Sequence, residues 1–291
     1  MTHSILITGA GGQVAHELAI ARSEHRLVAL SEKQLDITDL QQINDAFAEY
    51  RPDIVINAAA YTQVDRAEEE TSSAYAINRD AVANLAQACN SIDSPLLHIS
   101  TDYVFDGNKS GAYGEDDETS PAGVYGASKA AGDAVLQSLL ERHIILRTSW
   151  VFSATGNNFV KTMLRLGAER DELGIVNDQH GCPTSARSIA AALLQISQRY
   201  LRGDEIEWGT YHFCGQPETT WYGFAQQIFQ QANGFENLRL NEIPTSEYPT
   251  PATRPLNSVL DCSKIIAQFK TAQPDWREDL DNILVQLGYL S

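Results

Sequence analysis

The chain has 291 residues, with 21 Lys and Arg against 38 Asp and Glu, which gives a formal net charge of −17. An acidic protein lacks the positive field that gathers nucleic acids or anionic membranes, and no cluster of basic residues supplies one locally, so we expect neither partner. With 43% hydrophobic and 20% charged residues, the composition is that of a globular protein with one large domain or two modest ones.

The N-terminus and the cysteines indicate a cytoplasmic protein. Only Ile5–Ile7 precedes a glycine cluster, and this run is too short and its surroundings too uncharged for a signal peptide. No apolar run approaches the length that crosses a bilayer. The four cysteines have no C-x-x-C spacing, which predicts reduced thiols and no metal site, and they lie far apart in the sequence at Cys89, Cys182, Cys214 and Cys262.

The first half of the chain alternates short apolar runs with helical stretches. Nearly uninterrupted apolar runs, typical of strands covered on both faces of a parallel sheet, occur at Ile5–Ile7, Leu27–Leu30, Ile54–Ile56, Leu96–Ile99 and Ile144–Leu146. Helices are predicted between them over Leu40–Tyr50, Ser73–Ala88 and Ala127–Leu140. This alternation predicts the α/β class, with a Rossmann-type doubly wound parallel sheet over residues 1–152.

In the second half the pattern changes to longer loops with separate helices. The predicted helices cover Phe159–Glu169, Ser188–Tyr200 and Trp221–Ala232, and prolines cluster between positions 244 and 255. We expect residues 153–291 to form mainly a smaller C-terminal substrate-binding domain, with some segments returning to the sheet.

A glycine-rich turn lies directly after the first strand and before a helix. It reads Thr8-Gly9-Ala10-Gly11-Gly12-Gln13-Val14-Ala15, which is a G-x-x-G-x-x-A spacing. Such glycines let the backbone turn tightly and approach a pyrophosphate, which the free N–H groups of the helix N-terminus then bind. The turn predicts a dinucleotide site, against the alternative of a plain tight turn. The small residues of Asn57–Ala60, at the end of a strand, leave room for a cofactor or for close helix packing.

Two further segments carry side chains suited to acid–base chemistry. Ser100–Phe105 follows the strand that ends at Ile99, and Tyr125 and Lys129 share one face of a predicted helix because they are four residues apart. A phenol has an ordinary pKa of about 10, and a nearby ammonium favours its phenolate. With Thr101 to hold a carbonyl oxygen and Tyr125 to supply a proton, this group of side chains suits the reduction of a carbonyl by a nicotinamide hydride. The alternative is a surface helix whose tyrosine and lysine merely cover apolar area.

These motifs resemble the extended short-chain dehydrogenase/reductase family. Segments of the second half resemble the members of this family that reduce dTDP-linked 4-keto-6-deoxy sugars. These segments are Arg147–Val151, Asn157–Leu164, Asn177–Thr184 and Pro249–Pro255. The resemblance covers nearly the whole chain. It implies reduction of the C4 keto group of dTDP-4-dehydro-L-rhamnose by NADPH or NADH, to give dTDP-L-rhamnose.

The resemblance also implies roles for individual residues. The implied catalytic set is Thr101, Tyr125 and Lys129. The implied cofactor-binding set is Gly9, Gly12, Gln13, Val14, Asp36, Ile37, Ala58, Ala59, Tyr61, Tyr125 and Lys129. The implied substrate-binding set is Thr62, Thr101, Asp102, Tyr103, Trp150 and Arg254. Arg254 is the candidate for the diphosphate, and Lys161 and Arg165 either assist it or belong to a solvated helix face.

Some positions depart from the family pattern. Ala15 stands where many relatives have a third glycine, which one methyl group can replace if the helix lies slightly farther from the sheet. After the strand that ends at Leu30, Glu32 suits a ribose hydroxyl and Lys33 suits a 2′-phosphate, so we expect use of either NADH or NADPH.

The resemblance to the family also bears on the oligomeric state and on the use of a metal ion. Some relatives are described as dimers bridged by magnesium through glutamates. Glu17 is available here, but the position aligned with the second acidic ligand is Arg187, whose guanidinium repels a cation. We therefore expect no metal site, and a monomer or weak homodimer.

Three alternative functions remain at this point. A sugar-nucleotide 4,6-dehydratase would carry Asp-Glu after the threonine, whereas this chain reads Thr101-Asp102-Tyr103 and lacks the second carboxylate. A reductase of another dTDP-4-keto-6-deoxy sugar is the second alternative, because the sequence does not fix the stereochemistry of hydride delivery. A non-enzymatic protein resembling the regulatory subunit of methionine adenosyltransferase would bind the cofactor without consuming it.

Overall fold

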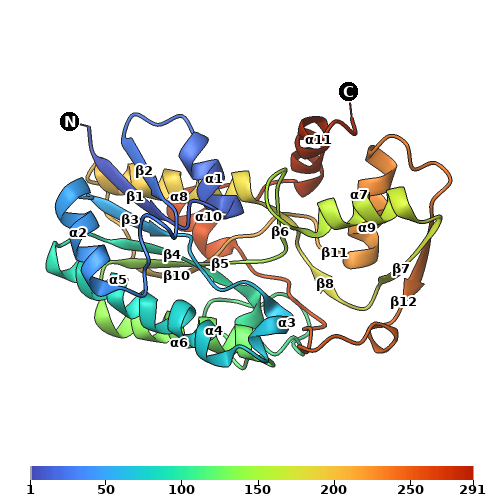
Figure 1. Ribbon diagram of the computed structural model, residues 1–291, viewed down its shortest axis with the longest axis horizontal. Helices are drawn as coiled ribbons and strands as arrows, with labels where there is room; N and C mark the ends of the chain where they lie inside the picture. Colours follow the sequence, from blue (N-terminus) through green and yellow to red (C-terminus); the bar gives the residue numbers. More distant parts are fainter. Residues whose placement is uncertain (1, 291) are drawn as a thin grey trace.

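The apolar runs of the first half are neighbouring strands of one parallel sheet. The computed structural model describes residues 2–290, so the outermost residue of each predicted domain lies outside the described residues. Its six-stranded sheet has the order β10–β5–β4–β3–β1–β2 (Figure 1). The strands are β1 (Ser4–Thr8), β2 (Arg26–Leu30), β3 (Ile54–Asn57), β4 (Leu96–Thr101), β5 (His143–Thr148) and β10 (Gly209–His212).

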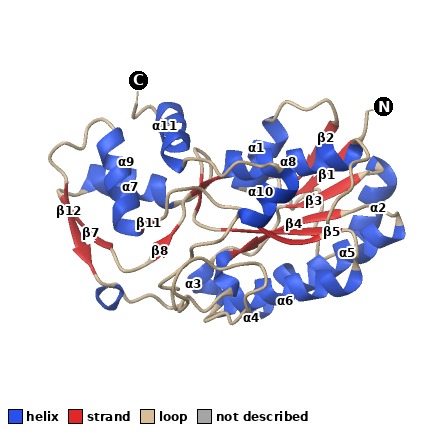
Figure 2. Cartoon of the chain, turned by 180° about the vertical axis from the view of Figure 1, so that it is seen from behind, coloured by secondary structure: helices blue, strands red, loops and turns tan. Residues whose placement is uncertain are grey.

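Helices cover both faces of this sheet, which confirms the predicted doubly wound α/β fold. One face packs against α1 (Gln13–Ile20), α8 (Ala186–Leu201) and α10 (Ser263–Phe269), and the other against α2 (Leu40–Tyr50), α5 (Ala81–Ser91) and α6 (Val124–Leu139) (Figure 2). Along β1, Ile5 and Ile7 point into the first core and Leu6 into the second, because successive side chains of a strand alternate. Burial on both faces explains the uninterrupted apolar runs.

The strand order reverses between β1 and β3. From β1 the chain steps outward to β2, and from β3 it steps the other way through β4 and β5. Open α/β sheets bind ligands outside the carboxyl ends of the strands at such a reversal, because the connecting helices leave on opposite faces there. Gly9 and Ala58 lie at this point, directly after β1 and β3.

The second half forms a smaller unit at one end of the sheet and also returns to it (Figure 1). The unit has its own apolar core. Its elements are β6 (Val151–Phe152), α7 (Phe159–Glu169), β7 (Glu172–Val176), β8 (His180–Gly181), β9 (Thr184–Ser185), β11 (Thr219–Thr220), α9 (Trp221–Gln231), β12 (Arg239–Ile243), η3 (Thr245–Glu247) and α11 (Trp276–Gln286). β7 pairs with β12, β8 with β11 and β6 with β9. The segments that return to the sheet are α8, β10 and α10.

One predicted helix differs from the observed structure. The stretch predicted over Ser73–Ala88 is divided into α4 (Thr71–Tyr75), the π-helix η1 (Ala76–Asp80) and α5, and α3 (Val64–Ala67) precedes it. The wider turn places the buried Asn78 side chain toward Tyr61, whose backbone N–H and C=O both bond to it at 2.9 and 3.1 Å. A helical period alone does not reveal this turn, because the contact that accompanies it is with a residue 17 positions away.

Helix α6 approaches the segment after β4 very closely at Gly126. A Cβ atom on this residue would lie 2.1 Å from the carbonyl oxygen of Tyr103, which belongs to the short helix η2 (Asp102–Val104). Only glycine permits this approach, which brings Tyr125 beside the end of β4.

We expect Gly126→Ala to lower the free energy of unfolding by about 1–3 kcal/mol, the usual cost of forcing extra volume into a packed contact. Ser138→Ala, at an exposed position of the same helix, is the matched control and should change it by less than about 0.5 kcal/mol. Urea unfolding of both variants checks this. Equal stability of the two would show that the contact does not constrain α6.

Candidate active site

The turn between β1 and α1 has the backbone conformation that a dinucleotide loop requires. Gly9 has φ +76°, and a Cβ atom there would lie 2.7 Å from the backbone nitrogen of Ala59. The Gly12 N–H closes the turn by donating to the Gly9 carbonyl at 2.8 Å. The loop therefore packs directly on the residues that follow β3, and any side chain at Gly9 would separate them.

The N-terminus of α1 is free to bind an anion. Gly12 provides no side-chain cap, the first turn has no acidic residue, and a Cβ atom on Gly11 would meet nothing within 4 Å. The start of α1 therefore has room beside Gly11 and no competing side-chain cap, which fits a pyrophosphate bound by the N–H groups of the first turn. Val14 and Ala15 are buried against the sheet, so the methyl group of Ala15 is accommodated there.

Gln13 connects this turn to the second unit. Its Oε1 accepts hydrogen bonds from the Ser153 hydroxyl and from Asn158 Nδ2, both at 2.9 Å. Asn158 in turn caps α7. The loop after β6 is thereby held against the turn that fits the pyrophosphate, which joins the two units at this point.

The residues predicted to lie near the adenosine occupy the edge of the sheet beyond β2. Asp36 accepts hydrogen bonds from the Thr38 N–H and hydroxyl at 2.9 and 2.7 Å, and Ile37 is buried in the core. Glu32 and Lys33 are both exposed, so both charged side chains are accessible to a ligand. The edge can therefore present either sign to a ribose or its phosphate.

Thr101 and Tyr125 come together at the end of β4. The Thr101 hydroxyl donates to Asp102 Oδ1 at 2.9 Å and accepts from the Tyr103 N–H at 3.2 Å, and it acts on the pKa of the neighbouring Tyr125 phenol. Burial raises the pKa of Tyr125 to about 12, and the Thr101 hydroxyl opposes this shift. At neutral pH the phenol therefore holds its proton.

Lys129 lies one turn after Tyr125 on the same helix. Its Nζ donates to the Ile99 carbonyl at 2.7 Å and lies 3.2 Å from His98 Nε2. Burial lowers its pKa to about 8, while Asp133 acts in the opposite direction. Among residues 2–290, Nζ has no hydrogen bond to the Tyr125 phenol, so the expected closeness of ammonium and phenol is not seen as a direct bond.

Asp102 and Tyr103 complete the wall around the phenol. Asp102 is almost fully buried, and burial raises its pKa to about 6 although the Ser258 and Thr101 hydroxyls oppose the shift. The Tyr103 ring packs edge to face against Tyr125, with 5.5 Å between centroids. Both side chains therefore adjoin the Thr101–Tyr125 pair.

Trp150 projects from the end of β5 with an unusual backbone. Its φ of +48° lies in the left-handed region, which a bulky side chain adopts only when its surroundings impose it. Its ring stacks on Trp221 at 3.6 Å between centroids, and Trp221 also packs against Phe159. The sequence alone did not predict that Trp221 and Phe159 lie near Trp150. The only signal for them in the sequence is that each is an aromatic residue at the start of a predicted helix.

Arg254 is brought to the loop that follows β3. Its guanidinium donates to Asp65 Oδ2 at 2.8 Å and to the Ala252 carbonyl at 3.0 Å, and its charge lowers the pKa of the Tyr103 phenol. Asp65 is on α3, three residues after the exposed Thr62. The structure thus places Arg254 near Tyr103 and in an ion pair.

Other predicted residues are less directly connected to this group. The Tyr61 phenol donates to Glu70 at 2.7 Å, and its backbone is bonded to Asn78. Lys161 and Arg165 lie on α7 in the second unit, where Arg165 is paired with Glu169 at 3.2 Å and well exposed.

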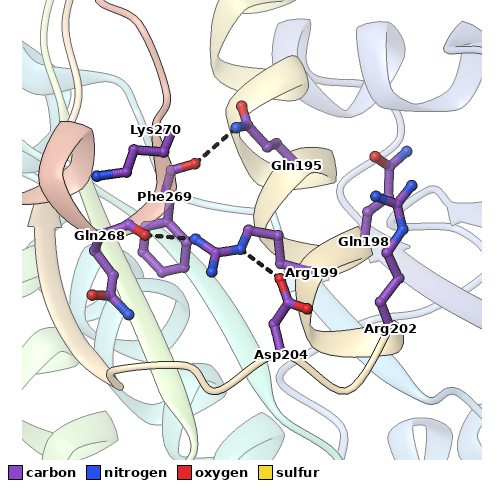
Figure 3. Close-up of a pocket in the computed structure, with 8 residues that line it drawn as sticks. All are labelled: Gln195, Gln198, Arg199, Arg202, Asp204, Gln268, Phe269 and Lys270. Carbon is purple, nitrogen blue, oxygen red and sulfur yellow. Dashed lines mark hydrogen bonds and ion pairs between the residues drawn. The ribbon is translucent and has the colours of Figure 1, made fainter.

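A surface cavity lies elsewhere, between the ends of α8 and α10 (Figure 3). Its central charged side chain, Arg199, is bonded to Asp204 and to the Gln268 carbonyl, so its charge serves the fold. None of the predicted site residues lines this cavity. Over residues 2–290, no group of three or more His, Cys, Asp or Glu side chains is arranged to hold a metal ion. Nor is any helix in this range long and apolar enough to cross a membrane.

Comparison with known proteins identifies the family of this chain. The family described as the RmlD substrate binding domain matches residues 2–288. The dTDP-4-dehydrorhamnose reductase of Aggregatibacter actinomycetemcomitans is 48% identical over 286 residues, which cover 96% of this chain and 97% of that protein. The protein of the same name from Escherichia coli K12 is 39% identical and covers 98% of each chain.

Solved structures show the same likeness. The crystal structure of dTDP-4-dehydrorhamnose reductase from Bacillus anthracis in complex with NADP superposes with a TM-score of 0.91 at 36% identity, covering 98% of this chain and all of that one. The resemblance predicted from the sequence is therefore confirmed. This chain belongs to the RmlD substrate binding domain family.

Proposed function

We propose that this protein is an NAD(P)H-dependent reductase that converts dTDP-4-dehydro-L-rhamnose to dTDP-L-rhamnose. The observation that carries the proposal is that Thr101, at the end of β4, lies next to Tyr125 of α6 on the sheet that carries the glycine turn at its strand-order reversal. Relatives that bear the name of this activity match almost the full length of the chain. We also propose that the protein acts in the cytoplasm.

The cofactor fits the turn between β1 and α1. The N–H groups at the start of α1, with Gly9, Gly12, Gln13 and Val14, would hold its pyrophosphate. Asp36 and Ile37 would adjoin the adenosine, Ala58, Ala59 and Tyr61 would line the path along the sheet, and Tyr125 and Lys129 would complete the site. A reduced nicotinamide supplies a hydride when bound.

The chain's own residues supply the rest of the chemistry. The Thr101 and Tyr125 hydroxyls would donate hydrogen bonds to the C4 keto oxygen, which polarises the carbonyl. As C4 gains the hydride, Tyr125 Oη would give its proton to that oxygen, so that the keto group becomes a hydroxyl. A phenol with a raised pKa holds this proton at neutral pH, and a cationic Lys129 would stabilise the phenolate that remains.

The substrate is expected between the two units. Thr62, Asp102, Tyr103 and Trp150 would contact the sugar, and Arg254 the diphosphate. The stacked Trp150 and Trp221 rings form an apolar support of the kind that suits a sugar face.

Nicotinamide absorbance tests the proposal. The protein, NADPH and dTDP-4-dehydro-L-rhamnose are mixed, and we expect absorbance to fall in proportion to the sugar added. Tight NADPH binding without consumption would instead favour the regulatory alternative.

Arg254→Ala should raise the KM for the sugar nucleotide about ten- to a hundredfold and leave that for NADPH unchanged, because a hydrogen bond to a charged group contributes about 1.5–3 kcal/mol. Arg165→Ala, which removes an exposed guanidinium, is the control and should leave both unchanged. Steady-state kinetics with each substrate varied measures this. An equal rise of both KM values would show that Arg254 stabilises the fold through its ion pair with Asp65 and does not bind the sugar nucleotide.

Removal of divalent metal should change neither the rate nor the oligomeric state, which we propose is monomer or weak homodimer. Arg187 is exposed on α8, and its guanidinium repels a cation that Glu17 on the adjacent α1 would otherwise attract. Activity and sedimentation velocity with and without EDTA check this. A chelator-dependent shift from dimer to monomer would contradict it.

A further inference from the structure

A row of buried polar side chains crosses the sheet beneath the proposed site. Thr8 on β1 pairs in register with Asn57 on β3, and Asn57 pairs with His98 on β4. All three are almost fully buried. The row ends at Lys129 of α6, whose Nζ is 3.2 Å from His98 Nε2. Because the atoms of this row lie within hydrogen-bond distance, donors and acceptors can be assigned one after another along it.

The Asn57 amide has one orientation. The backbone N–H of Ala59 lies 3.1 Å from Oδ1, and the Thr8 hydroxyl lies 2.6 Å from the same atom. A backbone N–H can only donate, so the atom that it faces is the amide oxygen. The Nδ2 of Asn57 must then face His98, where it lies 3.0 Å from Nδ1.

This orientation fixes the proton of His98. An amide Nδ2 can only donate, so His98 Nδ1 accepts and carries no proton. The ring is therefore neutral with its proton on Nε2, and burial also lowers the pKa of His98. The Nε2–H group then points at Lys129 Nζ. An ammonium has no lone pair to accept this hydrogen bond, whereas a neutral amine can accept it and still donate to the Ile99 carbonyl.

We infer that the Asn57–His98 pair favours the neutral amine of Lys129 over its ammonium in the cofactor-free protein, so that His98 is a positioning residue for Lys129. Protonation of Lys129 then requires the loss of its contact with His98. The other titratable groups that act on this contact are His143 on β5 and Asp133 on α6, and Arg147 on β5 acts on Asp133. Asp133, the group that favours the charged lysine, is itself bonded to Ser100 and Arg147.

The catalytic meaning of this inference rests on the proposed function. The proposed reaction uses Lys129 as a cation beside the phenolate, so a neutral Lys129 must gain a proton and leave His98 before turnover. The protonation states themselves can be measured without any substrate. An inactive protein with the inferred tautomer would overturn only the proposed function, and an active one with the opposite tautomer would overturn only the inference.

Two NMR measurements on the free protein test it. In ¹⁵N-labelled protein, with His98 assigned by its absence from His98→Gln, we expect the Nδ1 signal of an unprotonated nitrogen and the Nε2 signal of a protonated one. The chain has six lysines. Their ¹³Cε shifts should show Lys129 titrating at least one pH unit below the ordinary value of about 10.4. A proton on His98 Nδ1, or an ordinary pKa for Lys129, would overturn the inference.

Asn57→Asp should reverse the direction of the hydrogen bonds between residue 57, His98 and Lys129, and it hardly changes the shape of the side chain. One carboxylate oxygen would still accept from Thr8 and Ala59, and the second would now require a proton on His98 Nδ1. His98 Nε2 would then accept from the Lys129 ammonium, so the tautomer should switch and the pKa of Lys129 should rise by at least one unit. Asn84→Asp, on α5, adds the same charge without a bond to His98 and should leave the tautomer unchanged. An unchanged tautomer in Asn57→Asp would contradict the inference, and if that variant does not fold, the two wild-type measurements decide.

Discussion

Tyr125→Phe is expected to lower turnover at least a hundredfold while leaving the fold and the affinity for NADPH nearly unchanged. The phenol is placed to give a proton to the keto oxygen, and losing a general acid costs about a hundredfold or more. Only the hydroxyl is removed, so the packing of the ring against Tyr103 is kept. Stopped-flow or steady-state consumption of NADPH, with fluorescence titration of the cofactor, measures both quantities.

Tyr103→Phe is the matched control, because it removes the neighbouring phenol and keeps the same aromatic contact. We expect a much smaller loss of turnover there. Near-normal turnover in Tyr125→Phe would rule out Tyr125 as the proton donor. Thr101→Val should act on the same step, and the losses in the double variant should be less than additive because both hydroxyls orient one carbonyl.

Arg147→Met should lower the free energy of unfolding by about 3–5 kcal/mol, the cost of leaving the partner of a buried ion pair alone. Arg147 Nε lies 3.2 Å from Asp133 Oδ2, and the two side chains are only 6% and 3% exposed. Burial raises the pKa of Asp133, and Arg147 opposes that shift. Urea unfolding measures the loss.

Arg165→Met provides the control, since the Arg165–Glu169 pair has the same charges but a guanidinium side chain that is 60% exposed. Its effect should be below about 1 kcal/mol. Replacing both Arg147 and Asp133 by apolar residues should recover part of the stability, because no charge then remains buried. A loss below about 1 kcal/mol in Arg147→Met would show that the pair does not support the sheet beneath Lys129.

Much of the fold follows from local sequence pattern. The runs at Ile5–Ile7 and Ile54–Ile56 are strands because both faces of the sheet are covered, and this leaves an uninterrupted apolar signal. The glycine turn is equally readable, because Gly9 adopts a positive φ and touches Ala59. Tyr125 and Lys129 share a helix as their spacing predicts.

What could not be predicted depends on contacts between distant parts of the chain. The π-helix forms around the bonds of Asn78 to Tyr61, and the ion pair of Arg254 joins it to Asp65 across 189 residues. The position of Lys129 beside His98 depends on how α6 packs on β4. The Trp150–Trp221 stack likewise joins the end of β5 to the start of α9. Periodicity carries no information about such pairs.

Transfer of deuterium from labelled cofactor tests the proposed reaction most directly. NADPH carrying deuterium at the transferred position of the nicotinamide is incubated with the protein and dTDP-4-dehydro-L-rhamnose, and the product is examined by NMR. The proposed reaction predicts dTDP-L-rhamnose with one deuterium at C4 for each NADPH oxidised. A product without deuterium at C4, a C4 epimer of the expected sugar, or no oxidation of NADPH would contradict it.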